Sequence, residues 1–264
     1  MLGTIGLLMK MYIKTQFEYR VGFLLDRVAQ ILSYGAAYAS IWVMLNRFGS
    51  LGGWNWNEMA LLLSFHLLAY SLGAMLSFVQ FRDLEEMVRL GTFDVLLVKP
   101  FSPWAYLTFG GLNLLGYSGH IVLALGLMVW ALLQVNVDWT LWSAIYVVLS
   151  LVSAAMVTAA VMTMIGVAAL VLVQSTYLYS IFFGFWVLAR YPLSIFPVAL
   201  QWLMITVVPL GFMNYVPVAV FLGKDVAVLG GTALPLSLLA GPVAVGIAML
   251  HWRWSIRRYQ GGGG

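Results

Sequence analysis

The sequence predicts an all-α polytopic membrane protein, and three observations support this fold class. Of its 264 residues, 63% are hydrophobic and only 8% carry a formal charge, against about 25% charged residues in ordinary soluble domains. Six stretches of 19 to 51 residues contain no Asp, Glu, Lys or Arg, and about 20 apolar helical residues cross a bilayer core. These stretches are continuous, whereas the strands of a membrane barrel would alternate over about ten residues.

We expect one transmembrane domain over residues 1–264, with six transmembrane helices. The spans are predicted at about 28–45, 59–81, 104–134, 141–168, 171–189 and 226–250. The uncharged stretch 139–189 is 51 residues long, which is enough to cross the membrane twice. We place the turn between these two crossings near Gln174–Thr176, or a little before it.

The N-terminal residues 1–20 are predicted to form an interfacial helix. Lys10, Lys14 and Glu18 recur there at four-residue spacing, with apolar residues elsewhere around the helix. This pattern suits a helix that lies along the membrane surface rather than crossing it.

Residues 191–223 are predicted to form a re-entrant helical pair before the last span. They contain four of the eight prolines, and the run between Pro197 and Pro209 is eleven residues long. Eleven residues make about 16 Å of helix, which cannot cross a bilayer. Such a segment must therefore enter and return where other parts of the protein cover its backbone.

The distribution of Lys and Arg supports six crossings with both termini in the cytoplasm. In this topology the cytoplasmic side holds ten basic residues, at positions 10, 14, 20, 27, 82, 89, 99, 253, 257 and 258. The outer side holds three, Arg47, Arg190 and Lys224. The excess on the inside obeys the positive-inside rule, and a seventh crossing through 191–223 would remove it.

The most polar part of the chain lies between spans two and three. Residues 82–99 hold seven of the 22 charged side chains. Arg82–Leu90 can form a short amphipathic helix, and Gly91 follows where a left-handed residue commonly ends one. A connection of this length exceeds the usual 2–8 residues. We therefore expect a short cytoplasmic helix that fits a groove on a soluble partner.

The run EEMVRLGTFDVLLVKP resembles the cytoplasmic segment of ABC-2-type transporter permeases with six spans. The residues that fill the family's places are Glu86, Arg89, Gly91, Asp94, Leu97, Lys99 and Pro100. The proline-broken segment before the last span and the ending Arg257, Arg258, Tyr259 are also similar to that family. Leu90, between Arg89 and Gly91, departs from the family's spacing.

This resemblance implies the permease subunit of an ATP-driven exporter in the plasma (inner) membrane. Residues 82–99 would then be a coupling helix that docks on a separate ATPase subunit, and a second permease subunit, identical or related, would complete the path. The implied coupling residues are Arg82, Asp83, Glu85, Glu86, Arg89, Gly91, Asp94 and Lys99. ATP and Mg²⁺ would bind the ATPase, because this chain has no GxxxxGK[ST] motif, and we expect no cofactor here.

Four residues are candidates for a substrate path: His66, His120, Phe182 and Trp186. An ionisable side chain inside a membrane is a functional candidate, although an interhelical hydrogen bond explains each isolated histidine as well. The histidines lack the spacing of metal ligands, so no metal site is predicted. Ala69, Gly73 and Ser77 form a stripe of small residues that allows close helix approach, more plausibly within the subunit than between subunits.

Two other classes of function stay open. An ion-coupled carrier or channel would need acidic or basic residues deep in a span, and the predicted spans contain none. An intramembrane enzyme acting on lipids would need convergent carboxylates or a nucleophile with its base, whereas Glu58, Asp138 and Asp225 are scattered. The expected partners are ABC ATPase subunits, a second permease and the lipid bilayer, and no nucleic acid.

Overall fold

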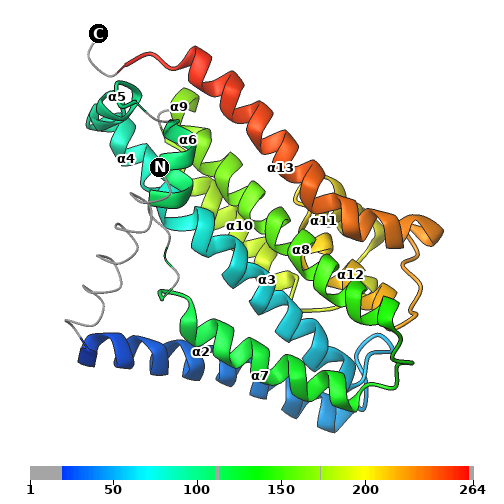
Figure 1. Cartoon of the computed structure of the whole chain (residues 1–264). Coiled ribbons are helices and arrows are strands. Elements are labelled where there is room, and N and C mark those ends of the chain that lie inside the picture. Colours follow the sequence, from blue (N-terminus) through cyan, green and yellow to red (C-terminus); the bar gives the residue numbers. More distant parts are fainter. Residues whose placement is uncertain (1–19, 101, 111–112, 114, 173, 262–264) are drawn as a thin grey trace.

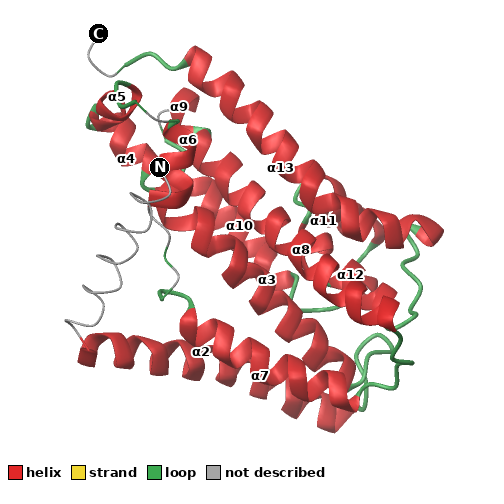
Figure 2. Ribbon diagram, viewed as in Figure 1, coloured by secondary structure: helices red, strands yellow, loops and turns green. Residues whose placement is uncertain are grey.

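The computed structural model describes residues 20–100, 102–110, 113, 115–172 and 174–261. Within this part the chain is helical and contains no strand (Figure 2). The predicted interfacial helix 1–20 lies outside the described residues, except for Arg20, where the first described helix begins.

The described α-helices are joined by short connections, several of which are 3₁₀ turns. The α-helices are α2 Arg20–Phe48, α3 Trp56–Arg82, α4 Leu84–Arg89, α5 Thr92–Leu97, α6 Pro103–Gly110, α7 Ser118–Gln134, α8 Leu141–Val167, α9 Ala169–Leu172, α10 Thr176–Leu188, α11 Val198–Thr206, α12 Tyr215–Phe221 and α13 Ala233–Arg258. The 3₁₀ turns are η1 Leu193–Ile195, η2 Leu210–Met213 and η3 Gly230–Thr232.

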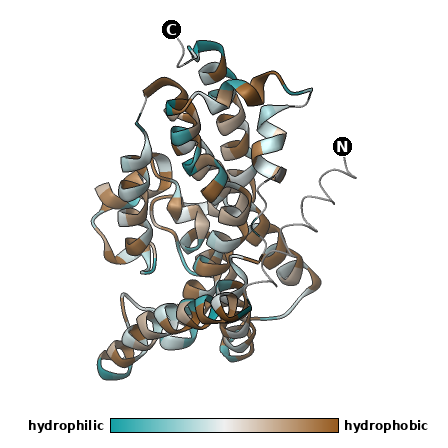
Figure 3. Cartoon of the chain, turned by 90° about the vertical axis from the view of Figure 1, so that its left-hand side faces the viewer, coloured by the Kyte–Doolittle hydropathy of each residue, from teal (hydrophilic) through white to brown (hydrophobic). Residues whose placement is uncertain are grey.

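The helices form a bundle with two distinct ends (Figure 1). One end holds α4, α5, α9 and the C-terminal end of α13, and α2 begins on the same side. The opposite end holds the connections from α2 to α3 and from α7 to α8, together with the start of α13. Hydrophobic residues recur along the helices, and hydrophilic ones gather near the C-terminus (Figure 3). This is the arrangement expected of a multi-pass membrane protein.

Among the described residues, four helical stretches are long and apolar enough to cross a membrane, namely Arg20–Phe48, Trp56–Arg89, Leu141–Leu172 and Gly230–Arg258. The stretch containing α3 is central, with 83% of its apolar window buried, whereas only 17% is buried in α2 and 28% in the stretch containing α13. The apolar helices α7 and α10 are shorter, with 17 and 13 residues. At 1.5 Å per residue, α10 reaches about 20 Å, short of a bilayer core of about 30 Å.

The predicted span 104–134 is not one helix, because the structure divides it into α6 and α7. The backbone amide of Asn113 donates to the carbonyl of Met75, and its side-chain oxygen accepts from the amide of Gly116 at 2.9 Å. A side chain that bonds the backbone a few residues on makes an Asx-type turn. This turn, which the uncharged composition did not reveal, separates the two helices.

Two other helices differ from the predicted spans at their ends. Within the predicted span 171–189, α9 ends at Leu172, and α10 begins at Thr176 and ends at Leu188. The predicted span 226–250 corresponds to Ala233–Arg258. Gly230 has a positive φ of 52°, which delays the start of α13.

The proline-rich segment 191–223 is broken into short helices, as its prolines predict. It contains η1, α11, η2 and α12, of which α11 has nine residues and α12 seven. Every residue of η2 is buried, and η2 packs against α8, α11 and α3. The backbone of this segment is thus covered by other helices, although its position in the membrane stays a prediction.

Glycines set the close packing of the three long helices. An added Cβ at Gly73 of α3 would lie 2.5 Å from the carbonyl oxygen of Ala155 in α8, and one at Gly241 of α13 would lie 2.4 Å from that of Ser153. Ala69 and Ser77 are buried beside Gly73 on α3. The small-residue stripe therefore packs inside the subunit, as predicted.

Replacing Gly73 with Ala is expected to destabilise the protein by about 1–3 kcal/mol, because the added methyl group overfills a closed helix crossing. The check is the temperature at which the purified, detergent-solubilised chain loses its monodisperse elution. The matched control is Gly246→Ala on α13, where an added Cβ meets nothing within 4 Å. Equal midpoints for the two variants would contradict the packing described here.

Candidate functional site

The polar segment folds into two short helices that pack on the end of the bundle. Gly91, between α4 and α5, has a φ of 70°, the left-handed conformation that its place in the sequence predicted. Leu84 of α4 and Phe93 of α5 are fully buried in a cluster with Leu170 of α9 and Trp252 of α13. The segment is therefore packed against α9 and α13, while Glu86, Arg89, Leu90, Val95 and Val98 are exposed.

The outward face combines charged and apolar side chains. Glu86 and Arg89 form an exposed ion pair at 3.7 Å across one helical turn. Leu90, Val95 and Val98 are 61%, 58% and 83% exposed. Sequence reasoning selected the charged residues and missed these three, although a helical arrangement of 82–99 could have placed them on one surface. Exposed apolar side chains rimmed by charges are typical of protein interaction sites.

Glu85 links the polar segment 82–99 to α10. Its Oε2 atom accepts hydrogen bonds from the amides of Ser175 and Thr176 at 2.6 and 2.7 Å, and from the Thr176 hydroxyl at 2.6 Å. The first amides of a helix have no partner inside it, and its N-terminus attracts negative charge. Since Ser175 makes no side-chain cap of its own, Glu85 of α4 caps α10 from a distant part of the sequence.

The Glu85 contact also sets the ionisation of that carboxyl. Burial alone would raise its pKa, but the hydrogen bonds from Thr176 and Ser175 outweigh burial and hold the pKa below the ordinary value of 4.5. A lowered pKa means that the contact contributes its full stability above pH 4.5 and loses it as the pH falls through the lowered pKa. Glu85 is therefore a carboxylate at neutral pH.

The other predicted coupling residues have different surroundings. Arg82 pairs with Asp83 at 3.0 Å, and its guanidinium also lies 5.4 Å from the ring of Phe78. Lys99 lies 4.6 Å from the ring centroid of Tyr106 in α6. Asp94 is partly buried near Gly261 beyond α13. Of the eight, only Glu86 and Arg89 are exposed charges paired solely with each other.

A second group of functional candidates lies near the middle of the bundle. His66 of α3 lies 4.5 Å from Trp186 of α10, between ring centroids. His120 of α7 lies 4.6 Å from Tyr34 of α2, and Tyr34 lies 6.0 Å from Trp186. Three of the predicted substrate-path residues are thus brought together. Phe182 is not part of this group. It lines a cavity of about 350 Å³ together with residues of α8.

Arg190 completes this group, whereas its predicted position on the outer side of the membrane stays a prediction. Its guanidinium carbon lies 4.8 Å from the ring centroid of Trp186 and 5.8 Å from that of Tyr34. Tyr34 is fourteen residues from each end of α2, so Arg190 lies near the middle of that helix's length. The structure thus places a charge among the aromatic rings of the bundle, which the sequence did not indicate. Tyr70 of α3 lies 5.0 Å from Trp186, between ring centroids. We call Tyr34, His66, Tyr70, His120, Trp186 and Arg190 the Arg190 cluster.

Glu58, at the opposite end of the bundle, has a structural role. Glu58 pairs with Lys224 at 3.0 Å, and its carboxylate accepts from the amide of Asn55 in a capping box at the start of α3. Lys224 also donates to the carbonyl of Gly53. In the described part of the chain, no three His, Asp or Glu residues lie together as metal ligands would.

Comparison with known families gave one match that covers most of the chain. Residues 31–263 match the model of a family described as ABC-2 family transporter protein. This range includes α4, α5, α10 and the Arg190 cluster. Searches of curated proteins and of solved structures found no match.

Replacing Glu85 with Ala is expected to destabilise the first turn of α10 by about 1 kcal/mol, the usual cost of a lost N-cap. Amide hydrogen exchange of the peptide that begins at Ser175 measures this directly, and exchange should become faster. The expected effect is local, because the buried contacts of Leu84 remain.

Glu86→Ala is the matched control, since Glu86 is the next residue and contacts Arg89 rather than α10. Its exchange should equal that of the unchanged protein. The difference in melting temperature between Glu85→Ala and the unchanged protein should persist above pH 4.5 and shrink below it. Equal exchange in both variants would contradict the capping contact.

Proposed function

Because the chain belongs to the ABC-2 family of transporter proteins, we propose that it is the permease subunit of an ATP-driven exporter coupled through residues 82–99 to a separate ATPase. Family membership makes the chain a transport subunit and not itself an enzyme. ABC ATPases are the general partners of this family, and in our proposal ATP and Mg²⁺ bind there.

The observation that carries this proposal is that Glu85 of α4 holds α10, while other residues of α4 and α5 form an exposed face. The face offers apolar side chains at Leu90, Val95 and Val98 beside the charges of Glu86 and Arg89. A short helix with such a face suits a groove on a soluble protein. On its other side α4 holds the N-terminus of α10 through Glu85.

In the proposed mechanism, closure of the ATPase pair displaces α4, and Glu85 passes this displacement to α10. The hydrogen-bonded helix is a stiff element of about 20 Å, and Trp186 near its other end belongs to the Arg190 cluster. A shift at the cytoplasmic end would therefore change the contacts of the cluster. This route joins the two groups of candidate residues through one helix.

The proposal also includes orientation and assembly. The end with α4, α5 and the C-terminus faces the cytoplasm, in agreement with the excess of basic residues there. A second permease subunit, identical or related, completes the path, and the sparsely buried helices α2 and α13 are the surfaces left for it and for lipid. An ion-coupled carrier would share the deep Arg190 but would not need the exposed face of α4.

The coupling proposal is tested by reversing two charges of the segment. The double change Glu86→Lys and Asp94→Lys is expected to lower ATP-dependent transport at least about tenfold, while the permease still folds. The reason is that an interface charge of the wrong sign costs several kcal/mol. The measurements are co-purification with candidate ABC ATPases, and drug or dye efflux from cells that express the chain together with the ATPase it binds.

The control for this experiment is Asp138→Lys, an exposed acid at the opposite end of the bundle, which should leave ATPase binding unchanged. Normal ATPase binding by the doubly changed permease would contradict docking at this face. Failure of the unchanged chain to co-purify with any ABC ATPase would contradict the proposed function as a whole.

A further inference from the structure

We infer that the Arg190 cluster binds the anionic headgroup of an amphipathic substrate, whose apolar tail lies in the groove between α2 and α7. This inference rests on the proposed transport function and adds a substrate class to it. The shared chemistry is a carboxylate or phosphate group on a single apolar chain.

The first observation is a concentration of buried polar atoms without partners. Five such atoms belong to the cluster and its neighbour Asn214: Arg190 Nε, His66 Nε2, Trp186 Nε1, His120 Nδ1 and Asn214 Oδ1, none of which has a hydrogen-bond partner among the described residues. His66 and Asn214 are completely buried. An unpartnered buried polar group is costly, so a group of them indicates a site that a polar ligand completes.

Hydrogen bonding in the cluster makes most of these atoms donors. Asn214 Nδ2 donates to the carbonyl of Ala189 at 2.5 Å, which fixes the orientation of its amide. The same nitrogen lies 3.4 Å from His66 Nδ1, so Nδ1 accepts and the proton of the neutral ring is assigned to Nε2. The atoms His66 Nε2, Trp186 Nε1 and Arg190 Nε are then three free N–H donors, which suit an anion.

The second observation is a charge without a counter-charge. Arg190 takes part in none of the ion pairs of the described residues. It lies beside aromatic rings at mid-depth of α2. A guanidinium in this position is expensive unless an anion accompanies it, and charged residues at such depth mark ligand pathways. The cluster thus supplies both the charge and the hydrogen-bond donors that a carboxylate or phosphate requires.

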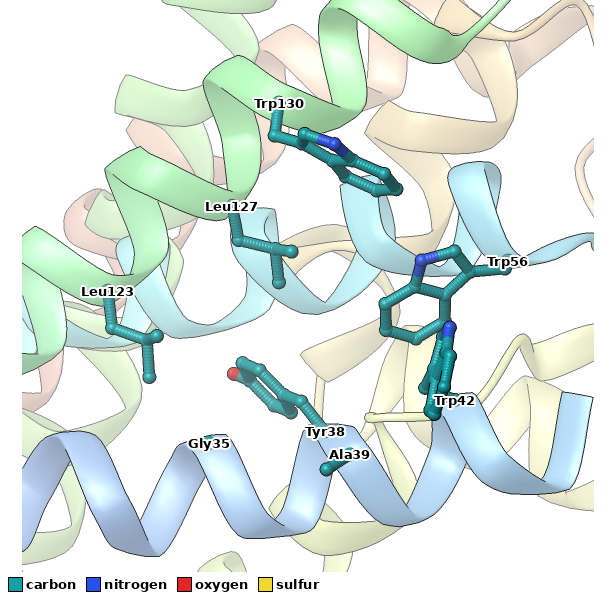
Figure 4. A pocket seen from close by; sticks show the side chains of 8 residues that line it. All are labelled: Gly35, Tyr38, Ala39, Trp42, Trp56, Leu123, Leu127 and Trp130. Atoms are coloured by element: carbon teal, nitrogen blue, oxygen red, sulfur yellow. The ribbon is translucent and has the colours of Figure 1, made fainter. Parts of the chain in front are cut away.

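The third observation is an apolar groove that begins one helical turn from the cluster. The rings of Tyr34 and Tyr38 lie 6.4 Å apart on α2, and Tyr38 lines a groove of about 380 Å³ (Figure 4). Its other walls are Gly35, Ala39, Trp42, Trp56, Leu123, Leu127 and Trp130. Its volume falls within the range of about 300–1,000 Å³ for ligand pockets, and Figure 4 shows its tryptophans around one end.

The direction of the groove fits export from the inner leaflet. From Gly35 to Trp42 it follows α2 away from the end that carries α4 and toward the outer end. A lipid-like molecule of the inner leaflet has its headgroup at the cytoplasmic surface and its tail pointing the same way. If the headgroup moves from the cytoplasmic surface to the depth of Arg190, the tail keeps its direction and lies along the groove.

The test is binding of labelled probes to the purified full chain in bilayer discs of neutral phosphatidylcholine. We expect laurate and dodecyl phosphate to bind at least about tenfold more tightly than dodecanol, the value of one charge-assisted hydrogen bond. Acetate and inorganic phosphate, which have the charge without the tail, should not compete. Equal binding of dodecanol and dodecyl phosphate would overturn the assignment of the headgroup to the Arg190 cluster. Competition by inorganic phosphate at equal concentration would overturn the assignment of the tail to the groove.

Matched variants separate the two parts of the site. Arg190→Gln should abolish the preference for anionic probes, whereas Arg47→Gln, an exposed arginine of α2, should retain it. Gly35→Leu should block the groove and weaken dodecyl phosphate several-fold, whereas Gly22→Leu should not; an added Cβ meets nothing within 4 Å at either glycine. An unchanged preference in Arg190→Gln, or unchanged affinity in Gly35→Leu, would overturn the inference.

Two arrangements keep this test decisive. If Arg190→Gln does not fold, Trp186→Phe removes one N–H donor and should reduce the anionic preference several-fold, and no reduction would count against the site. Probe binding needs no ATPase, so its loss would overturn the substrate class alone, while loss of ATPase co-purification would overturn the coupling alone.

Discussion

The contact between the Glu85 carboxylate and the first amides of α10 is the interaction on which the proposed mechanism depends. A helix N-terminus and a carboxylate attract each other through hydrogen bonds and through the helix dipole. Most other contacts of α4 and α5 are apolar, and apolar contacts have little direction. Three hydrogen bonds shorter than 2.8 Å instead fix one oxygen atom of α4 to one end of α10. The two helices are therefore expected to move together.

The length and position of α10 determine where a movement at the Glu85 contact is transmitted. The helix begins at the Glu85 contact and carries Trp186 near its other end, where Arg190 follows. It ends at Leu188, and the chain continues into the broken segment 191–223. Because α10 is short, the positive charge of Arg190 lies inside the bundle, next to aromatic rings and an apolar groove. Energy applied at the cytoplasmic end would reach the proposed substrate site through one continuous helix.

The sequence predicts what depends on neighbouring residues and misses what depends on distant ones. Gly91 and the amphipathic pattern of Arg82–Leu90 are local signals, and the structure confirms the helix end that they predict. Glu85 and Ser175 are 90 residues apart, so their contact leaves no trace in the spacing of either segment. Arg190 ends an uncharged stretch, and nothing in that stretch indicates its contacts with Tyr34 of α2 and Trp186 of α10. The turn at Asn113 was hidden inside a stretch of uniform hydrophobicity.

The most direct test of the central claim is a pair of distances between spin labels in the complex with the co-purified ATPase. One pair joins Asp83→Cys at the N-terminal end of α4 to Tyr177→Cys in the first turn of α10, and both positions are exposed. The other joins Tyr177→Cys to Leu250→Cys on α13. During ATP turnover we predict an unchanged first distance and a changed second distance. A change in the distance between α4 and α10, with the distance to α13 constant, would contradict the account.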